Sequence, residues 1–242
     1  MLHKLTPGSL QDVSICLQLS VKRSEYKIEF FIVSAGVPLP SSWVDMTQYG
    51  NFRTETLEPK TAEYQGVEQA FTQTLKPGYN LRQIVRIERL QNIQQYRQYV
   101  ILKQTLDAKN PKGTTNERTL YHGTSADSVD KMSKKGFNRS FAGKNVTATL
   151  YGAGTYFAVN SEMSARSIYS PPDANGYKYI YQAKVLTGEY TVGSQNMLVP
   201  PSKNPNDPTD CYDSVVDNMQ NPEIFVVFND ALAFPEYLIV FY

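Results

Sequence analysis

One of the two histidines stands where a ligand can be bound. His122 ends a short apolar run and is followed directly by Gly123 and Thr124. A strand that ends in His-Gly presents an imidazole beside a backbone that no Cβ covers, so a planar ligand can bind the main chain there. The alternative is a structural histidine at a strand end. The other histidine, His3, is close to the N-terminus.

Two later segments offer side chains for the same kind of site. Residues 152–154 read Gly-Ala-Gly and lead to Tyr156. They lack the third glycine and the helix of a dinucleotide fingerprint, so they predict a tight turn that presents the tyrosine. The helix expected at 161–168 places Ser164 and Ser167 on one face, and small hydroxyls near a pocket can hold an amide. A core tyrosine and a plain surface helix are the alternatives.

Several other chemistries are excluded by the pattern. Cys16 and Cys211 form no CxxC pair, and no zinc-ligand spacing, P-loop, GxSxG elbow or Cys–His pair occurs. The carboxylates form no obvious metal cluster. We therefore expect no metal and no disulfide framework.

The C-terminal half must hold these residues on short elements. The expected strands are 119–122, 154–157, 178–187, 223–229 and 236–242, and the expected short helices are 127–134, ending at the C-cap Gly136, and 161–168. Strict alternation of strands and helices is lacking, so a doubly wound parallel sheet is not expected. The pattern predicts an α+β fold with mixed, mostly antiparallel sheets and short helices.

Two longer helices are expected before this half. In the first, Tyr64, Val67, Phe71 and Leu75 share a face, and Pro77-Gly78 ends it. A strand around 84–87 follows. The second helix is expected from about Gln91 to Ala108, with these residues turned inward: Ile93, Tyr96, Val100 and Leu106.

The first 37 residues form a separate β extension. Apolar residues alternate over 15–19 and 26–30, with a turn at 22–25. This segment is too short for an independent domain and stays unassigned. After a Pro- and Ser-rich linker, Trp43 is interpreted as a packing anchor. The main domain is therefore expected at 38–242.

Composition limits the partners. The chain has 24 Lys and Arg against 23 Asp and Glu, which excludes a global basic field for nucleic acid. No run approaches the length of a membrane span, and the N-terminus has no long apolar stretch. A cytosolic or nuclear location is the expectation.

Taken together, the motifs identify a family resemblance. His122-Gly123-Thr124, the run GTYFA at 154–158 and IFVVF at 224–228 resemble, in order and spacing, the poly(ADP-ribose) polymerase family, whose catalytic domain is related to diphtheria toxin. Three more segments look like its macrodomain-linked mono-ADP-ribosyltransferase branch: GFNRSFAGKN (136–145), PPSKNPNDPTDCYDSV (200–215) and FPEYLIVFY (234–242). The resemblance covers roughly residues 39–242.

The resemblance implies a role for each site residue. NAD⁺ is the co-substrate, and a His–Tyr–Glu triad holds it, which places His122 and Tyr156 in the first two positions. Gly123 and Ser164 would hold the nicotinamide carboxamide, with Tyr169 and Tyr156 stacking on its ring. Two further residues are expected to contact NAD⁺. Thr124 follows Gly123, and Arg139 would contact the phosphates or the adenine. Met163 departs from the aromatic residue that close relatives tend to have.

The third triad position separates mono-transfer from polymer synthesis. We align Ile224 with the family's glutamate, because the apolar run then matches without a gap. A slip of one residue would put Glu223 there and turn its side chain to the other face. Isoleucine accepts no hydrogen bond, so the resemblance implies transfer of one ADP-ribose.

Three functions therefore stay open at this point. The first is an NAD⁺-dependent mono-ADP-ribosyltransferase that acts on protein, with self-modification and a nucleic-acid acceptor both open. The second is a catalytically weak or inactive scaffold that binds NAD⁺ or ADP-ribose. The third is a polymer-forming transferase that uses Glu223.

Overall fold

The chain divides into two units, residues 1–42 and 43–242. The computed structural model describes residues 14–22, 25–33, 36–75, 79, 81, 83–141 and 149–242. In the first unit, β1 (Ser14–Lys22) pairs antiparallel with β2 (Glu25–Val33), as the alternation predicted. The middle of the expected turn, residues 23 and 24, lies outside the described residues.

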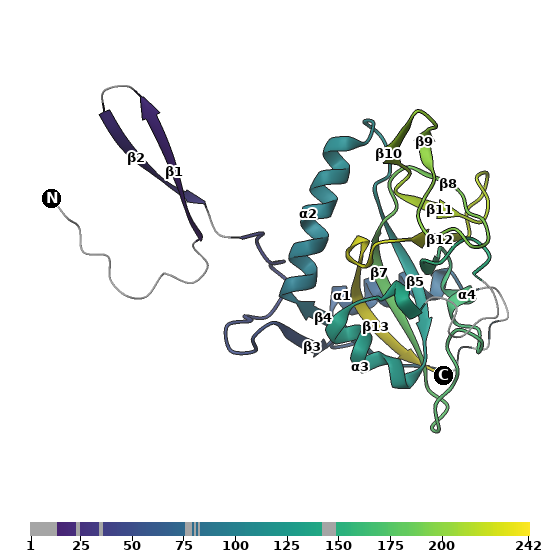
Figure 1. Cartoon of the computed structure of the whole chain (residues 1–242). Helices are drawn as coiled ribbons and strands as arrows, with labels where there is room; N and C mark the ends of the chain where they lie inside the picture. The colour runs from purple at the N-terminus through teal and green to yellow at the C-terminus, as the bar shows by residue number, and fades with distance from the viewer. Residues whose placement is uncertain are drawn as a thin grey trace. The chain divides into compact units, whose positions relative to one another are not determined.

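The second unit is built on one large sheet (Figure 1). Its strands are β3 (Phe52–Thr56), β4 (Ile84–Asn92), β5 (Glu117–Thr124), β6 (Thr155–Ala158), β7 (Lys178–Leu186), β8 (Tyr190–Val192), β11 (Ser214–Val216), β12 (Ile224–Val227) and β13 (Ala233–Phe241). They lie in the order β3-β4-β13-β7-β5-β6-β12-β11-β8, and only β11 and β8 are parallel neighbours. A separate ribbon joins β9 (Ser202–Asn204) to β10 (Asp207–Cys211). The α+β prediction is confirmed.

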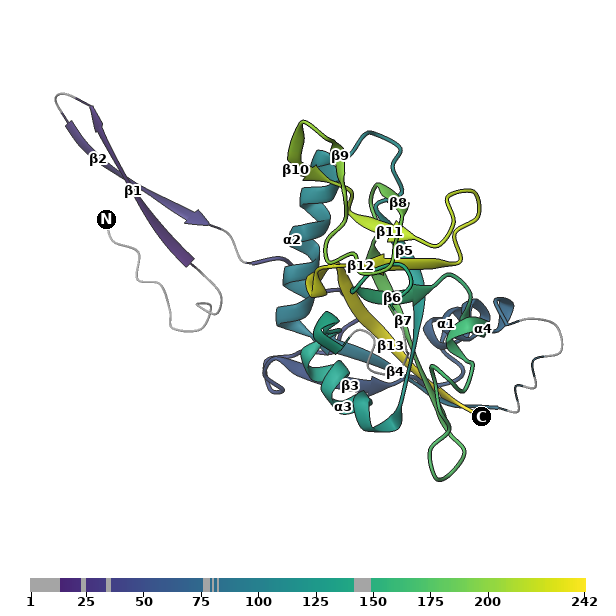
Figure 2. The same cartoon turned by 45° about the vertical axis from the view of Figure 1, so that its right-hand side comes forward.

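Helices cover both faces of the sheet (Figure 2). They are α1 (Ala62–Gln73), α2 (Ile93–Lys109), α3 (Ala126–Lys135), α4 (Ser161–Ser164) and the 3₁₀ turns η1 (Arg139–Phe141) and η2 (Asp230–Leu232). In Figure 2, α2 and α3 lie on one side of β7 and β13, and α1 and α4 lie on the other. The buried residues agree, because neighbours along β7, such as Ile180 and Tyr181, belong to clusters on opposite faces.

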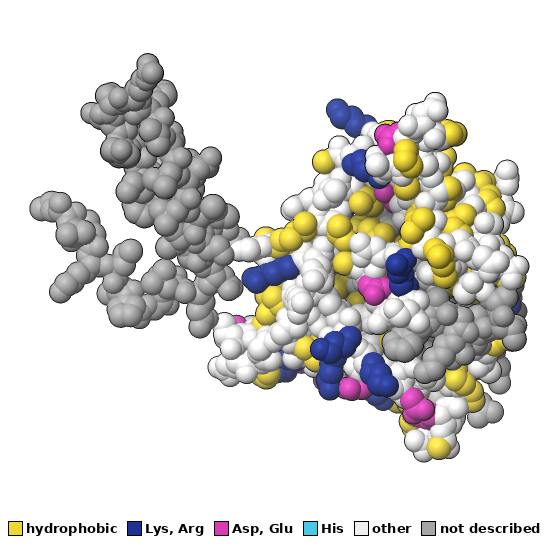
Figure 3. All heavy atoms as spheres, in the orientation of Figure 1, with side chains coloured by type: hydrophobic (Ala, Val, Ile, Leu, Met, Phe, Trp, Pro, Cys, Tyr) yellow, Lys and Arg dark blue, Asp and Glu magenta, His cyan; other side chains and the backbone are white. Residues whose placement is uncertain are grey.

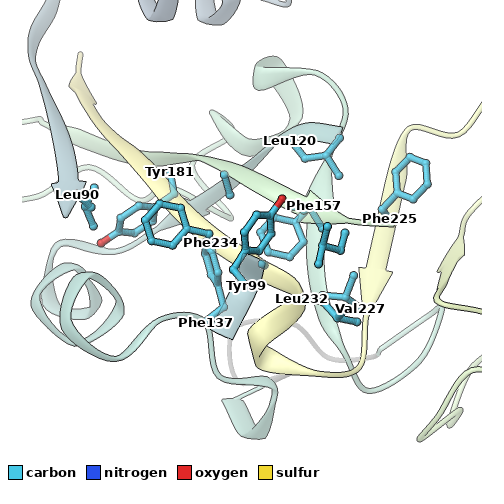
Figure 4. Close-up of a cluster of buried hydrophobic side chains, with 14 of the residues drawn as sticks. Leu90, Tyr99, Leu120, Phe137, Phe157, Tyr181, Phe225, Val227, Leu232 and Phe234 are labelled. Carbon is cyan, nitrogen blue, oxygen red and sulfur yellow. The ribbon is translucent and has the colours of Figure 1, made fainter. Parts of the chain in front are cut away.

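The larger cluster is rich in aromatic rings (Figure 4). Tyr99 of α2, Phe137, Phe157 and Phe234 meet there, and Phe137 packs edge-on against Phe157 with ring centroids 4.9 Å apart. Trp43 packs at its margin, 5.3 Å from the Tyr96 ring, which confirms its interpretation as an anchor. Two rings of this cluster, Phe137 and Phe157, pack against His122.

Local signals explain most helix ends. The side chain of Thr61 caps α1 by accepting the Tyr64 N–H at 3.2 Å, and Tyr64, Val67 and Phe71 are buried as predicted. The predicted end of α1 at Pro77-Gly78 lies outside the described residues. Gly136 ends α3 at φ 79°, where its N–H donates to the Met132 carbonyl at 2.8 Å.

Two helix predictions were wrong at one end. Gln91 belongs to β4, and α2 begins only at Ile93, because Asn92 caps it by accepting the Gln95 N–H at 3.1 Å. The helix expected at 161–168 ends at Ser164, after which the chain turns. Five short strands were also missed, namely β3, β8, β9, β10 and β11.

Candidate active site

The sheet opens between the two strands that carry the predicted histidine and tyrosine. Only one residue pair, Tyr121 with Ala158, joins β5 to β6, although β5 pairs along its whole length with β7. Just past that pair, His122 Nδ1 lies 2.8 Å from the carbonyl oxygen of Tyr156. A side chain therefore links the strands where the backbone ladder stops.

This contact defines the state of the imidazole. A carbonyl oxygen can only accept, so Nδ1 carries the proton and donates it. The ring also lies against Phe137 and Phe157, with centroids 5.2 and 5.6 Å away. Burial lowers the pKa of His122 below its ordinary value, and the bond to the Tyr156 carbonyl opposes this in part. The ring is neutral at pH 7, and its Nε2 offers a lone pair.

Gly123 lies directly beneath the segment that follows β6. A Cβ at this position would overlap the Ser164 carbonyl oxygen and would lie 3.1 Å from the Cβ of Tyr169. Ser164 is buried, whereas Tyr169 is partly exposed. The bare backbone of Gly123 thus allows the three residues predicted for the nicotinamide end to meet.

Helix α4 is tied to α1 by small hydroxyls. The Ser161 Oγ donates to the Phe71 carbonyl at 2.6 Å, and the Ser161 N–H donates to Thr74 Oγ1 at 3.0 Å. Ser161 is completely buried. These bonds anchor the first residue of α4, and thereby the position of Ser164 at the end of the same helix.

A half-buried lysine, Lys178, holds the end of the same helix. Lys178 Nζ donates to the Ala165 carbonyl at 2.6 Å, and the Tyr79 hydroxyl donates to the same oxygen at 3.2 Å. Burial lowers the pKa of Lys178. Sequence reasoning missed Lys178, Thr74 and Ser161 as supports, because their partners lie far away along the chain.

The His122 side chain contacts the backbone carbonyl of Tyr156, but the Tyr156 side chain points elsewhere. The Tyr156 hydroxyl accepts the Tyr151 N–H at 3.0 Å and donates to the Gly152 carbonyl at 2.8 Å. Its ring belongs to a third apolar cluster, with Val226 and Phe228. The phenol therefore fastens the turn that precedes it, in addition to any contact with a ligand.

Ile224 shares a face with Tyr156. Ile224 pairs with Ala158 and Val226 pairs with Tyr156, so the four side chains point to one side of the sheet. Glu223, one residue earlier, is exposed.

Asp217 holds the start of this strand. One of its oxygens accepts the N–H groups of both Glu223 and Ile224, each at 3.0 Å. Asp217 therefore fixes the register that presents the isoleucine.

Two predicted contact residues are engaged within the protein. The Thr124 hydroxyl donates to Met132 Sδ at 3.2 Å. The Arg139 Nη1 donates to the Leu198 carbonyl at 3.2 Å, and its backbone N–H donates to Asp230 at 2.9 Å. Thr124 thus contacts α3, and Arg139 contacts Leu198 and Asp230, while their predicted contacts with NAD⁺ stay predictions. His3 lies outside the described residues.

A pocket of about 420 Å³ lies elsewhere, between α2, Phe137 and η2, and its lining includes none of the residues predicted to form the site. Phe137 separates it from His122, because this ring lines the pocket and packs on the imidazole. Within the described ranges, no group of three or more His, Cys, Asp or Glu side chains is arranged to hold a metal ion.

Charged side chains are dispersed over the one face seen in Figure 3. Lys and Arg side chains are scattered with hydrophobic ones between them over the face of residues 43–242 seen in Figure 3. Of the described helices, none combines the length and apolarity needed to cross a bilayer.

Comparison with known proteins gives consistent matches. The family described as the poly(ADP-ribose) polymerase catalytic domain matches residues 61–242. The human protein mono-ADP-ribosyltransferase PARP14 is 49% identical over 210 residues, which cover 87% of this chain and 11% of that protein. Mouse protein mono-ADP-ribosyltransferase PARP10 is 42% identical over 77% of this chain and 19% of its own length. Mouse PARP11, another protein mono-ADP-ribosyltransferase, is 30% identical over 93% of this chain and 72% of its own.

Proposed function

The chain belongs to the poly(ADP-ribose) polymerase catalytic-domain family, and from this premise we propose that residues 38–242 bind NAD⁺ and transfer one ADP-ribose unit to a protein side chain. The chain spans only 11% and 19% of the first two relatives, so this proposal concerns the transferase step alone. The role of residues 1–37 and a cytosolic or nuclear location stay predictions.

The observation that carries the proposal is the opening between β5 and β6. The neutral imidazole of His122 is fixed through Nδ1, so Nε2 can accept a hydrogen bond from a ribose hydroxyl of the adenosine half. Gly123, Ser164 and Tyr169 lie together on the other side of β5, where the carboxamide and the ring of nicotinamide fit. The two ends of the dinucleotide are thus gripped by neighbouring residues of one strand.

Such a grip suits the chemistry of NAD⁺ cleavage. The bond between nicotinamide nitrogen and ribose C1″ breaks, its electron pair stays on nitrogen, and the pyridinium leaves as neutral nicotinamide. The leaving group needs no proton, so no general acid is required. The ribose gains oxocarbenium character, and the acceptor oxygen then forms the new bond to C1″. Positioning supplies most of the rate in this scheme.

Ile224 limits the product to a single unit. Its side chain lies on the Tyr156 face, and it offers no acceptor to orient the ribose hydroxyl of a second ADP-ribose. Glu223 is exposed and precedes the strand, which argues against polymer synthesis through that carboxylate. The acceptor in this proposal is a group on a protein. The assay should also test whether the chain modifies itself and whether it modifies nucleic acid.

Incubation with labelled NAD⁺ and sizing of the labelled protein tests the proposal. We expect a single ADP-ribose per site, abolished by His122→Ala with the fold retained. Glu223→Gln is the matched control, because it should leave the single transfer unchanged. Long ladders that disappear in Glu223→Gln would establish polymer synthesis instead.

The second candidate is a scaffold that holds NAD⁺ without cleaving it. The half-buried imidazole of His122, bonded to the Tyr156 carbonyl and packed against Phe157, favours an intact donor site over this alternative. Calorimetry with NAD⁺ combined with a nicotinamide-release assay separates the two. Binding without release would support the scaffold.

A further inference from the structure

Two of the three residues predicted for the nicotinamide end lie on the stretch that follows β6, residues 161–170, which we call the α4 segment. Ser164 comes directly before Ala165, and Tyr169 comes directly before Ser170. Ala165 and Ser170 are both completely buried. The bonds that these two buried residues make therefore decide where the side chains before them lie.

Both buried residues are bonded to the first two residues of β7. The Lys178 Nζ donates to the Ala165 carbonyl at 2.6 Å. The Ser170 Oγ donates to the Tyr179 carbonyl at 3.0 Å and accepts the Tyr179 N–H at 2.8 Å. The α4 segment is thus fastened to one strand at two points, each directly after a predicted nicotinamide contact.

The same strand also holds the third predicted contact. Ile180, the next residue of β7, pairs with Gly123 of β5. β7 lies inside the sheet, because β13 pairs with it on one side and β5 on the other. Residues 178–180 of an interior strand therefore connect to Ala165, Ser170 and Gly123, which together set the geometry of the proposed nicotinamide end.

Of these three connections, the one from Lys178 alone uses a charged side chain. Lys178 is half-buried, and burial lowers its pKa. Its bonds run to neutral oxygens, the Ala165 carbonyl and, at 3.4 Å, the Tyr79 hydroxyl, which donates to the same carbonyl. An ammonium group taken from water costs free energy that neutral oxygens offset less well than a carboxylate does. A role in placing Ala165 accounts for a lysine at this position.

Resting on the proposed transferase function, we propose that Lys178 is a positioning residue for the nicotinamide end of the donor site. It holds the Ala165 carbonyl and thereby places the Ser164 hydroxyl for the carboxamide. The adenosine end depends on His122, which is fixed by its bond to the Tyr156 carbonyl and not by Lys178. Affinity at the two ends can therefore be changed separately.

The test uses calorimetry with two ligands, each of which reports on one end of the site. Benzamide carries the ring and the carboxamide of nicotinamide, whereas ADP-ribose lacks both. We expect Lys178→Met to raise Kd for benzamide about tenfold and to leave Kd for ADP-ribose unchanged. Lys178→Arg keeps a donor and should retain most of the benzamide affinity. A purely structural role would lower the melting temperature without separating the two ligands.

Lys203→Met is the matched control. Lys203 is half-buried like Lys178 and donates to Glu189 at the same distance, 2.6 Å, but it lies on β9. Its substitution should change neither Kd. Tyr79→Phe removes the second donor to the Ala165 carbonyl and should raise Kd for benzamide about threefold. This milder variant decides the question if Lys178→Met does not fold, and an unchanged Kd would then count against the proposal.

The remaining outcomes overturn separate parts of the argument. Equal benzamide affinity in Lys178→Met and in the unmodified protein would remove Lys178 as a positioning residue. A parallel loss of both ligands would make Lys178 a support of the whole fold instead. If the unmodified protein bound ADP-ribose but not benzamide, the nicotinamide end would be misplaced. Failure to release nicotinamide from NAD⁺ would refute the proposed function, while a selective loss of benzamide would still assign Lys178 to this end of the site.

Discussion

Substitution of Gly123 by alanine tests the contact that brings Gly123, Ser164 and Tyr169 together at the proposed nicotinamide end. The added Cβ would overlap the Ser164 carbonyl oxygen and would lie 3.1 Å from the Cβ of Tyr169. Backbone atoms cannot rotate away, so α4 or β5 must shift. Overpacking of this kind costs about 1–3 kcal/mol. For a domain of this size each 1 kcal/mol lowers the melting temperature by about 2–4 °C.

The shift should also weaken the donor site. Calorimetry with NAD⁺ should show affinity reduced at least about tenfold, because the carboxamide and ring contacts move together. Gly66→Ala is the matched control, since Gly66 lies inside α1 with nothing within 4 Å of a new Cβ. It should stabilise the protein by about 0.5–1 kcal/mol and leave NAD⁺ affinity unchanged. If both variants melted at or above the unmodified protein and bound NAD⁺ equally, the contact at Gly123 would have no role.

Three further changes have defined outcomes. Tyr156→Phe leaves the Tyr151 N–H without its acceptor and should lower the free energy of unfolding by about 1–2 kcal/mol in urea titrations; no change would show that the hydroxyl supports nothing. Because the pKa of His122 is lowered from 6.5, kcat/KM for NAD⁺ should stay level from pH 8 to about 6.5 and fall only on further acidification, as Nε2 gains a proton; a fall above that pH contradicts the neutral state. Asp217→Asn keeps an oxygen that can accept the N–H groups of Glu223 and Ile224, so it should preserve single transfer. Asp217→Ala removes this oxygen and should lower the melting temperature by about 2–8 °C. Equal melting temperatures for the two variants would show that these two hydrogen bonds do not stabilise the start of β12.

Periodicity predicted the elements that form the centre of the fold. The apolar runs at 178–187 and 236–242 correspond to β7 and β13, which are neighbours in the sheet. Gly136 was predicted as a C-cap because only glycine adopts that φ cheaply, and it ends α3. Signals within a few residues were thus sufficient wherever burial or a cap decided the structure.

Predictions were wrong where distant partners decide the outcome. Helix α4 ends at Ser164, and the next carbonyl, that of Ala165, is held by Lys178 and Tyr79, 13 and 86 residues away. The strands β8 and β11 pair in parallel across a gap of more than 20 residues, and they have only three residues each. No short window of sequence contains these contacts.

For the candidate site, residue types and their spacing in the sequence identified the residues but did not predict their hydrogen bonds. His122, Gly123 and Ser164 were placed together by the family resemblance, and the structure brings them close. That the Tyr156 hydroxyl faces Tyr151 and Gly152 was not foreseeable, because it depends on how the turn closes. Their roles in catalysis stay predictions until the variants are measured.

The position of β13 has a consequence for how the domain is made. This strand follows all the other described strands of the sheet in sequence, yet it lies between β4 and β7 and pairs with both. While the ribosome is still adding residues 233–241, the earlier strands lack the partner that joins them, and their apolar edges stay open. The core can therefore close only once residues 233–241 have been made, and chaperones that shield unpaired strand edges should matter most before that point.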